Sequence, residues 1–128
     1  MRSVKVILVL ALLLASVPAS AMTYEGYKRL KHSANEGSIE AVTLTVYLAV
    51  LANTYTDTNL TLRNKGKTPL YCQPEKLSLN NEAIIDILET MAEKTRQSGA
   101  EVDTDSVSTL LLEGLRETFP CRIHSARK

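Results

Sequence analysis

Two cysteines, Cys72 and Cys121, are the side chains of this sequence that could do the most varied chemistry. A thiolate can be a nucleophile beside a histidine, or a zinc ligand among further cysteines and histidines. The histidines are His32 and His124, but the close-spaced ligand pairs of a metal site are missing from the sequence. A catalytic pair with either histidine would leave the other cysteine without a role. A disulfide bond is the interpretation that uses both cysteines.

The N-terminus has the pattern of a secretory signal peptide. Basic residues precede the apolar run Val6–Val17, and small residues up to Ala21 form a cleavage site. The run is shorter than the roughly 20 apolar residues that a membrane-spanning helix needs. We therefore predict that residues 1–21 are removed and that the mature protein is periplasmic. An uncleaved anchor is the alternative.

Export has consequences for the mature domain, residues 22–128. In an oxidising compartment an even number of cysteines favours pairing, so we predict a disulfide between Cys72 and Cys121. Cleavage removes Arg2 and Lys5, two of the 15 basic residues, and leaves the 14 acidic ones. The nearly neutral domain has no electrostatic basis for binding nucleic acid or an anionic membrane surface. No later segment is apolar enough to span a membrane.

Hydrophobic periodicity predicts an all-α fold, a small domain of four helices. The first helix is expected over Thr23–Glu36, and Gly37 ends it. Ser38 is the expected cap of the second, Ile39–Leu60, whose length without Gly or Pro outweighs the strand preference of its β-branched residues. We expect it to be the central helix of the core. Its apolar stripe is wide: Ile39, Val42, Val46, Tyr47, Val50 and Leu51 follow helical spacing, with Leu44, Leu48 and Ala49 around them.

Two more helices follow a predicted loop, Leu62–Lys76. Ser78 is the expected cap of the third helix and Asp103 that of the fourth, Thr104–Thr118. Gly114 lies on the apolar face of the fourth helix, which predicts a close approach of another helix.

The two cysteines flank this helical pair. Cys72 precedes the third helix, and Cys121 follows the fourth directly after Pro120. Two antiparallel helices joined by a short loop have their outer ends together, so the predicted disulfide would close a hairpin.

Two irregular segments with concentrated charge are candidate partner-binding sites. The candidates are Arg63, Lys65 and Lys67 in the basic turn and Glu101, Asp103 and Asp105 in the acidic turn. Each turn could steer a charged partner, and the alternative is that both are ordinary solvated connections. Close to the basic turn, Asn59 lies in Asn-Leu-Thr, an N-glycosylation pattern that matters only in an organism that uses it.

The residues around the cysteines also form a pattern. YCQPEKLSLNNEAIIDILETM contains a Cys-x-Pro turn and a serine before a helix, and VSTLLLEGLRETFPC is a Leu-rich helix that ends in Phe-Pro-Cys. Over Tyr71–Cys121 the sequence resembles the Rap/Tai-type immunity proteins of bacterial type VI secretion. The N-terminal half is similar in helical layout only, since Ala41–Ala52 lacks the glycines that related sequences often have there. The resemblance implies a periplasmic homodimer without a cofactor that binds a peptidoglycan amidase effector and blocks its active site.

A second interpretation comes from another functional class. Periplasmic acid-stress chaperones of the HdeA type are also small, exported and helical, with one disulfide. Such a chaperone protects several unrelated proteins at acid pH, whereas an immunity protein binds one amidase near neutrality. A small secreted hydrolase is a third interpretation, but the sequence offers no nucleophile with a base and an orienting group. We therefore expect a protein that is not an enzyme and binds no metal.

Overall fold

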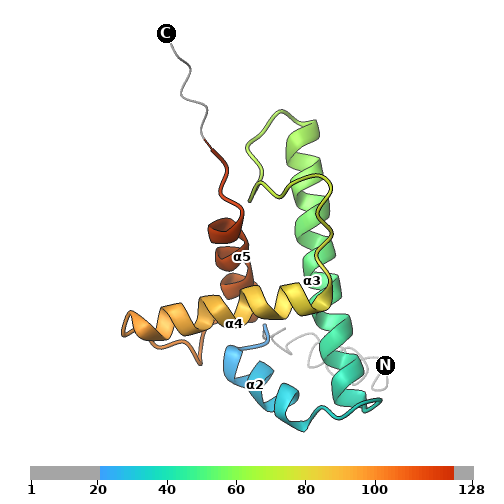
Figure 1. The fold of residues 1–128 in the computed structure, drawn as a ribbon, viewed down its shortest axis with the longest axis vertical. Coiled ribbons are helices and arrows are strands. Elements are labelled where there is room, and N and C mark those ends of the chain that lie inside the picture. Colours follow the sequence, from blue (N-terminus) through green and yellow to red (C-terminus); the bar gives the residue numbers. More distant parts are fainter. Residues whose placement is uncertain (1–20, 123–128) are drawn as a thin grey trace, which may run out of the picture.

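The computed structural model describes residues 21–122 and shows the predicted all-α fold (Figure 1). The first helix, α2 (Tyr24–Ser33), ends before the predicted Glu36, and the second, α3 (Ile39–Asn64), continues past the predicted Leu60. No helix in the described part of the chain is both long and apolar enough to cross a membrane. Most of the expected signal peptide and His124 lie outside the described residues. The two helices that follow α3 are α4 (Asn81–Gln97) and α5 (Val107–Thr118).

Each helix begins at a side chain that accepts a hydrogen bond from an N–H group of the first turn. Ser38 caps α3, as predicted. The cap of α4 is Asn80, so the prediction of Ser78 is wrong. The intervening Leu79 packs against the core, which keeps this stretch of chain extended up to Asn80.

α5 also begins later than predicted, because the residues before it are bonded to α2. Ser106 caps α5, and the prediction of Asp103 is wrong. The carbonyl oxygen of Asp103 accepts a hydrogen bond from Glu25 N at 3.0 Å, and that of Asp105 accepts one from Tyr24 N at 2.8 Å. These bonds to another helix hold the segment in a non-helical conformation.

Only one side of the wide apolar stripe predicted for α3 faces the core, and the other side is exposed. We call the exposed side the outer face: Ile39, Val42, Val46 and Val50, which are 82%, 57%, 55% and 59% exposed. The buried residues of α3 form the inner face: Leu44, Leu48 and Asn59. Tyr47 and Leu51 are partly buried against the core, so the prediction is correct for these two and for Leu44 and Leu48, and wrong for the four residues of the outer face.

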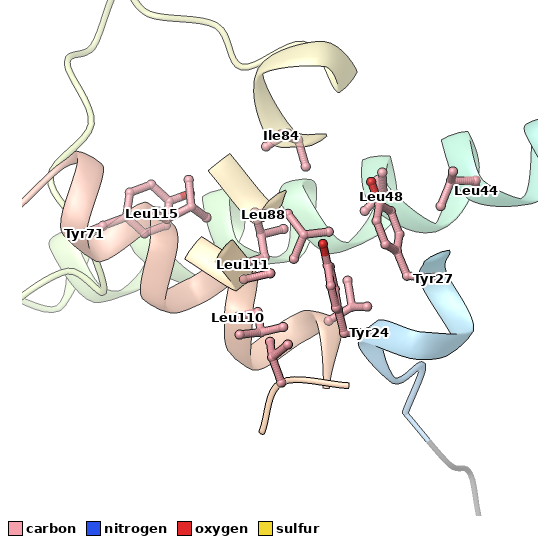
Figure 2. Close-up of a cluster of buried hydrophobic side chains, with 13 residues drawn as sticks. Tyr24, Tyr27, Leu44, Leu48, Tyr71, Ile84, Leu88, Leu110, Leu111 and Leu115 are labelled. Atoms are coloured by element: carbon pink, nitrogen blue, oxygen red, sulfur yellow. The ribbon is translucent and has the colours of Figure 1, made fainter. Parts of the chain in front are cut away.

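The core lies where α2, α4 and α5 meet the inner face of α3. Figure 2 shows Tyr27 of α2 beside Leu44 and Leu48, with Leu88 of α4 close by. α4 lies across both α3 and α5 in Figure 1 and contacts both. A Cβ atom at Gly114 would be only 2.7 Å from Ile87 Cγ2. The predicted close approach at this glycine is therefore confirmed, and its partner is α4.

Candidate functional site beside the disulfide

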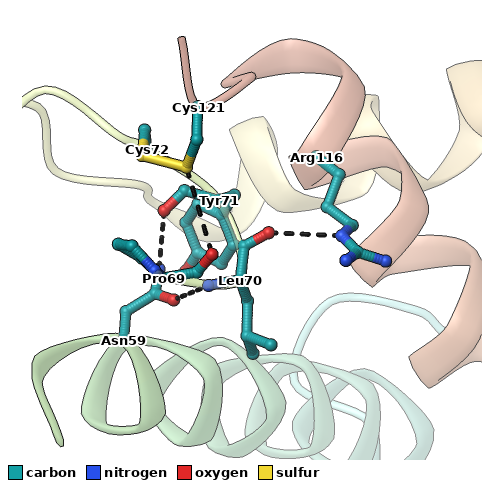
Figure 3. The surroundings of a disulfide bond; sticks show 7 residues. All are labelled: Asn59, Pro69, Leu70, Tyr71, Cys72, Arg116 and Cys121. Atoms are coloured by element: carbon teal, nitrogen blue, oxygen red, sulfur yellow. Dashed lines mark hydrogen bonds between the residues drawn. A yellow bond between two sulfur atoms is a disulfide. The ribbon is translucent and has the colours of Figure 1, made fainter. Parts of the chain in front are cut away.

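Cys72 and Cys121 form a disulfide bond, as predicted (Figure 3). Neither sulfur is then a free thiolate that could attack a substrate or bind zinc. The bond is consistent with an oxidising compartment. It does not close the predicted hairpin, because the chain after Cys72 runs along α3 before α4 begins (Figure 1). The disulfide instead fastens the end of α5 to the segment that follows α3.

Polar and aromatic contacts strengthen this attachment on both sides of the disulfide. Cys72 N donates a hydrogen bond to Phe119 O at 2.8 Å, and Arg116 Nε donates one to Leu70 O at 3.2 Å (Figure 3). The ring of Tyr71 is buried against Phe119, with ring centroids 6.4 Å apart. Burial raises the pKa of the Tyr71 hydroxyl, so this ring stays neutral.

Asn59 attaches the same segment to α3. Its side-chain N–H donates a hydrogen bond to Tyr71 O at 3.1 Å, and its Oδ1 accepts one from Leu70 N at 2.7 Å (Figure 3). Asn59 is the one buried polar residue of the described chain. Both its nitrogen and its oxygen are engaged and the side chain is buried, so the folded structure leaves little room for a glycan on Nδ2. Asn59 is thus a structural residue of the inner face, despite its glycosylation pattern.

We call residues 69–77, which the disulfide at Cys72 attaches to the end of α5, the tied segment. A groove lies between the last turns of α3 and this segment. Its volume is about 300 Å³. Exposed Leu60 and Leu77 supply apolar surface at the groove, and Arg63 and Glu75 supply charge. The side chain of Gln73 donates a hydrogen bond to Leu77 O and so fixes the wall opposite α3. The remaining lining residues are Thr56, Asn59, Tyr71 and Pro74.

A group of cations that we call the cationic tip adjoins the groove: Arg63, Lys65 and Lys67, all exposed. Arg63 lies in the last turn of α3 and also lines the groove. Gly66 adopts a φ of +64°, which permits the chain to turn sharply between the two lysines. Within residues 21–122 none of the three cations forms an ion pair with a carboxylate. The cationic tip is therefore available to an acidic partner.

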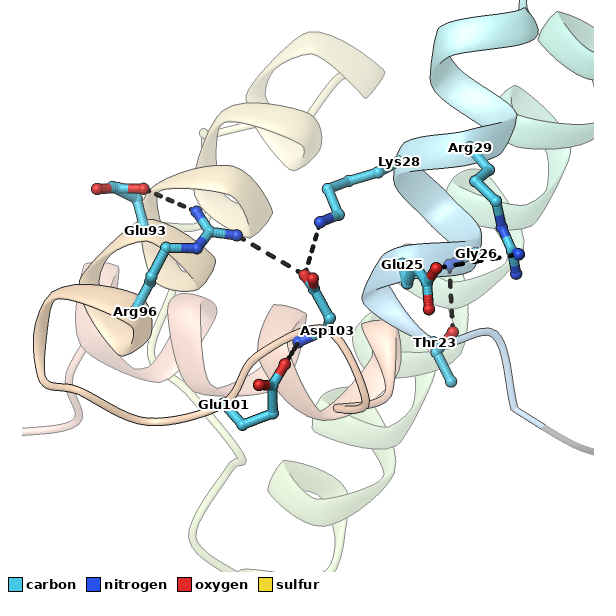
Figure 4. Close-up of polar contacts among 9 residues, drawn as sticks. All are labelled: Thr23, Glu25, Gly26, Lys28, Arg29, Glu93, Arg96, Glu101 and Asp103. Carbon is cyan, nitrogen blue, oxygen red and sulfur yellow. Dashed lines mark hydrogen bonds and ion pairs between the residues drawn. The ribbon is translucent and has the colours of Figure 1, made fainter.

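The acidic turn differs, because internal contacts occupy much of it. Asp103 Oδ1 accepts a hydrogen bond from Lys28 Nζ at 2.6 Å and lies 3.8 Å from Arg96 (Figure 4). Glu101 Oε1 accepts a hydrogen bond from Asp103 N at 3.1 Å. Asp105 is only partly exposed, and its carbonyl oxygen binds the start of α2. These contacts show that the acidic turn holds the start of α2 against the residues that precede α5.

A second hollow, of about 230 Å³, lies between α4 and α5 next to Gly114. The ion pair of Lys94 and Glu117 spans it, so its cation is already neutralised. His32 is exposed at the end of α2. Within residues 21–122 no group of three or more histidine, cysteine or carboxylate side chains could hold a metal ion. The groove and the cationic tip are the better candidate site.

Sequence reasoning found the cations of this site and missed its walls. The signal that could have found them is an asparagine in the middle of an apolar helix, where a buried amide needs partners from elsewhere in the chain. Comparisons of the chain with protein families, with curated proteins and with solved structures gave no match.

Proposed function

We propose that this chain is a periplasmic immunity protein that binds and inhibits a peptidoglycan amidase effector of type VI secretion. The observation that carries the proposal is the groove with its adjoining cationic tip, held on the scaffold by the disulfide and by Asn59. An inhibitor of this kind needs a rigid surface and no chemistry of its own. The resemblance over Tyr71–Cys121 supplies the identity of the target.

Attachment of the tied segment at several points supports such a role. The disulfide, Asn59 and Arg116 hold residues 69–72 from three directions. A surface that is ordered before binding loses little conformational entropy when a partner docks. Leu60 and Leu77 offer apolar contact at the groove, and the cations beside them add charge. The surface therefore suits a protein loop that carries an apolar side chain next to carboxylates.

Binding is tested with the Cys–His amidase encoded by an adjacent gene and the oxidised chain purified from a periplasmic extract. We expect one chain to bind per amidase and to stop the release of peptides from peptidoglycan. Replacing all three cations by alanine should weaken binding about tenfold or more, mainly by slowing association.

The matched control replaces the same number of charges in the acidic turn: Glu101→Ala, Asp103→Ala and Asp105→Ala. This variant should keep its affinity for the amidase within about twofold, after correction for any loss of folded protein. Equal weakening by both sets would contradict the assignment of the site. Absence of any complex with the amidase would overturn the proposed function itself.

Export is tested separately. The full chain is expressed in a Gram-negative host, and the protein of the periplasmic extract is sequenced from its N-terminus. We expect the sequence to begin at Met22, directly after Ala21. A protein that retains residues 1–21 and sediments with membranes would contradict the periplasmic assignment.

An HdeA-type chaperone is the second candidate, and one contact favours it. Glu89 of α4 accepts hydrogen bonds from Tyr27 and Lys31 of α2, and acidification would protonate this carboxylate. Loosening of α2 would then expose the apolar inner face of α3. A chaperone should suppress the aggregation of several unrelated proteins at acid pH. The immunity proposal expects no such protection.

A further inference from the structure

The hollow between α4 and α5 combines an apolar floor with a charged rim. Its buried and partly buried lining residues are Ile87, Met91 and Gly114, so the bottom of the hollow is apolar. The other lining residues are exposed and polar, and they form the rim: Asp86, Thr90, Lys94, Glu117 and Thr118. An apolar surface with a few polar groups around it is the usual composition of a small-molecule site.

The floor is shallow because α5 has no side chain where α4 comes closest. A Cβ atom at Gly114 would be 2.7 Å from Ile87 Cγ2 and 3.3 Å from Met91 Cβ. These two side chains therefore lie directly on the backbone of α5. The volume of about 230 Å³ is below the roughly 300 Å³ at which pockets for drug-sized ligands begin. The hollow thus suits a small molecule.

Charge is distributed unevenly along the rim. Asp86, Thr90 and Lys94 are spaced four residues apart, so they form a row about 12 Å long on α4. At one end of the row Lys94 pairs with Glu117 of α5. At the other end Asp86 forms no ion pair within residues 21–122. The rim therefore keeps one negative charge that no cation of the described chain balances.

The neighbours of Asp86 strengthen this negative end. Glu82 precedes it by one turn and Glu89 follows it by three residues, so the three carboxylates lie on one side of α4. Lys31 balances the charge of Glu89 only. The field at this end of the hollow attracts a cation and repels an anion. A bare metal ion would gain nothing from the apolar floor, whereas an organic cation with an apolar body can use both features.

We propose that this hollow binds a small primary amine whose apolar body lies on Ile87 and Met91 and whose ammonium group pairs with Asp86. The reverse orientation would place the ammonium group beside Lys94, which repels it. Because Asp86 is exposed and the ligand has few atoms, we expect a dissociation constant on the order of 1 mM. The inference does not depend on the proposed amidase target.

The site is tested by NMR titration of the isotope-labelled, oxidised mature chain with n-hexylamine. We expect saturable shifts at the residues of the hollow and nuclear Overhauser effects between the hexyl chain and the methyl group of Met91. The uncharged n-hexanol should bind about fourfold more weakly, because it lacks the ion pair. Hexanoate should not bind measurably. Absence of hexylamine binding, or shifts confined to another part of the chain, would overturn the proposal.

Two variants show whether Asp86 provides the selectivity. Asp86→Asn should bind hexylamine and hexanol equally, because neither then has an ionic partner. The matched control is Glu113→Gln, which changes an exposed carboxylate of α5 that does not line the hollow and should keep the wild-type preference. Both positions are exposed, so both variants should unfold at the wild-type temperature. An Asp86→Asn variant that still prefers the amine would contradict the assignment.

A lysine side chain of another protein carries the same chemistry, and one further probe separates the two sources. Nα-acetyl-lysine methylamide combines an ammonium group on an alkyl chain with the polar groups of a peptide backbone. It should bind more weakly than hexylamine, since the apolar floor offers its amide groups no hydrogen-bond partner. Tighter binding of the lysine derivative would show that the hollow receives a protein and would overturn its assignment to a small molecule.

Discussion

The two faces of α3 are built from the same kinds of side chain and have different environments. Leu44 and Leu48 on the inner face are buried beneath α2 and α4, whereas Val46 and Val50 on the outer face are exposed. The inner face also holds Asn59, whose amide binds the segment tied by the disulfide. A helix that is apolar on both sides can thus pack into the core with one face and leave the other face free to contact a partner.

The largest expected loss of stability comes from removing the disulfide, which attaches the segment bound by Asn59 of the inner face. Replacing Cys72 and Cys121 together by serine should lower the free energy of unfolding by about 4 kcal/mol, since the bond closes a loop of 49 residues. The quantity to measure is the urea midpoint by circular dichroism at a low protein concentration. Wild-type protein under reducing conditions is the control and should show a similar loss. A midpoint equal to that of the oxidised protein would show that the tie contributes little.

A matched pair of truncations compares the two faces directly. Leu48→Ala should cost about 3 kcal/mol, because it leaves a cavity in the core. Val46→Ala should change the stability of the monomer by no more than about 0.5 kcal/mol, because its side chain is already in solvent. Both values come from denaturation of the dilute protein. Similar losses at both positions would break the distinction between the faces.

A pair of asparagines extends the comparison to polar groups. Asn59→Ala should cost about 2 kcal/mol, because it leaves Leu70 N and Tyr71 O without their partner. Asn53→Ala, at an exposed position of the same helix, should cost no more than about 0.5 kcal/mol. Hydrogen exchange of the Leu70 amide should accelerate in the first variant only. Continued protection of this amide would contradict the role of Asn59.

The smallest expected change in stability concerns Glu89 of α4, which binds α2 where this helix covers part of the inner face. Burial alone would raise the pKa of Glu89, but the hydrogen bonds from Lys31 and Tyr27 and the charge of Lys31 outweigh it and lower the pKa below 4.5. A lowered folded-state pKa stabilises the fold above the unfolded-state value, and this contribution disappears as pH falls through the folded-state value. Because the pair is partly exposed, we expect no more than about 1 kcal/mol.

Glu89→Gln tests this pH dependence. The variant should be less stable than wild type at neutral pH, and the difference should shrink on acidification because the wild-type carboxyl then also becomes neutral. Glu93→Gln is the control, since among the described residues Glu93 pairs only with its neighbours Arg96 and Gln97 on α4. A difference that grows as pH falls would show that the charge of Glu89 does not stabilise the fold.

The candidate site was predicted in part. Arg63, Lys65 and Lys67 were recognisable as a cluster of charge in an irregular segment, and the structure leaves them exposed. The groove beside them could not be predicted, because its two walls come from separate parts of the chain. Their distance depends on the disulfide and on Asn59, which bring the tied segment against the end of α3.

The sequence by itself determined that this chain forms helices, roughly where they lie, and which cysteines pair. Local periodicity, Ser38 as a cap and the presence of only two cysteines are sufficient for these conclusions. Only the tertiary structure decided which face of α3 is buried. Valine on one side and leucine on the other gain similar free energy from burial, so the choice depends on where α2 and α4 pack. The same distant contacts placed Asn59 inside the protein and left Val46 outside.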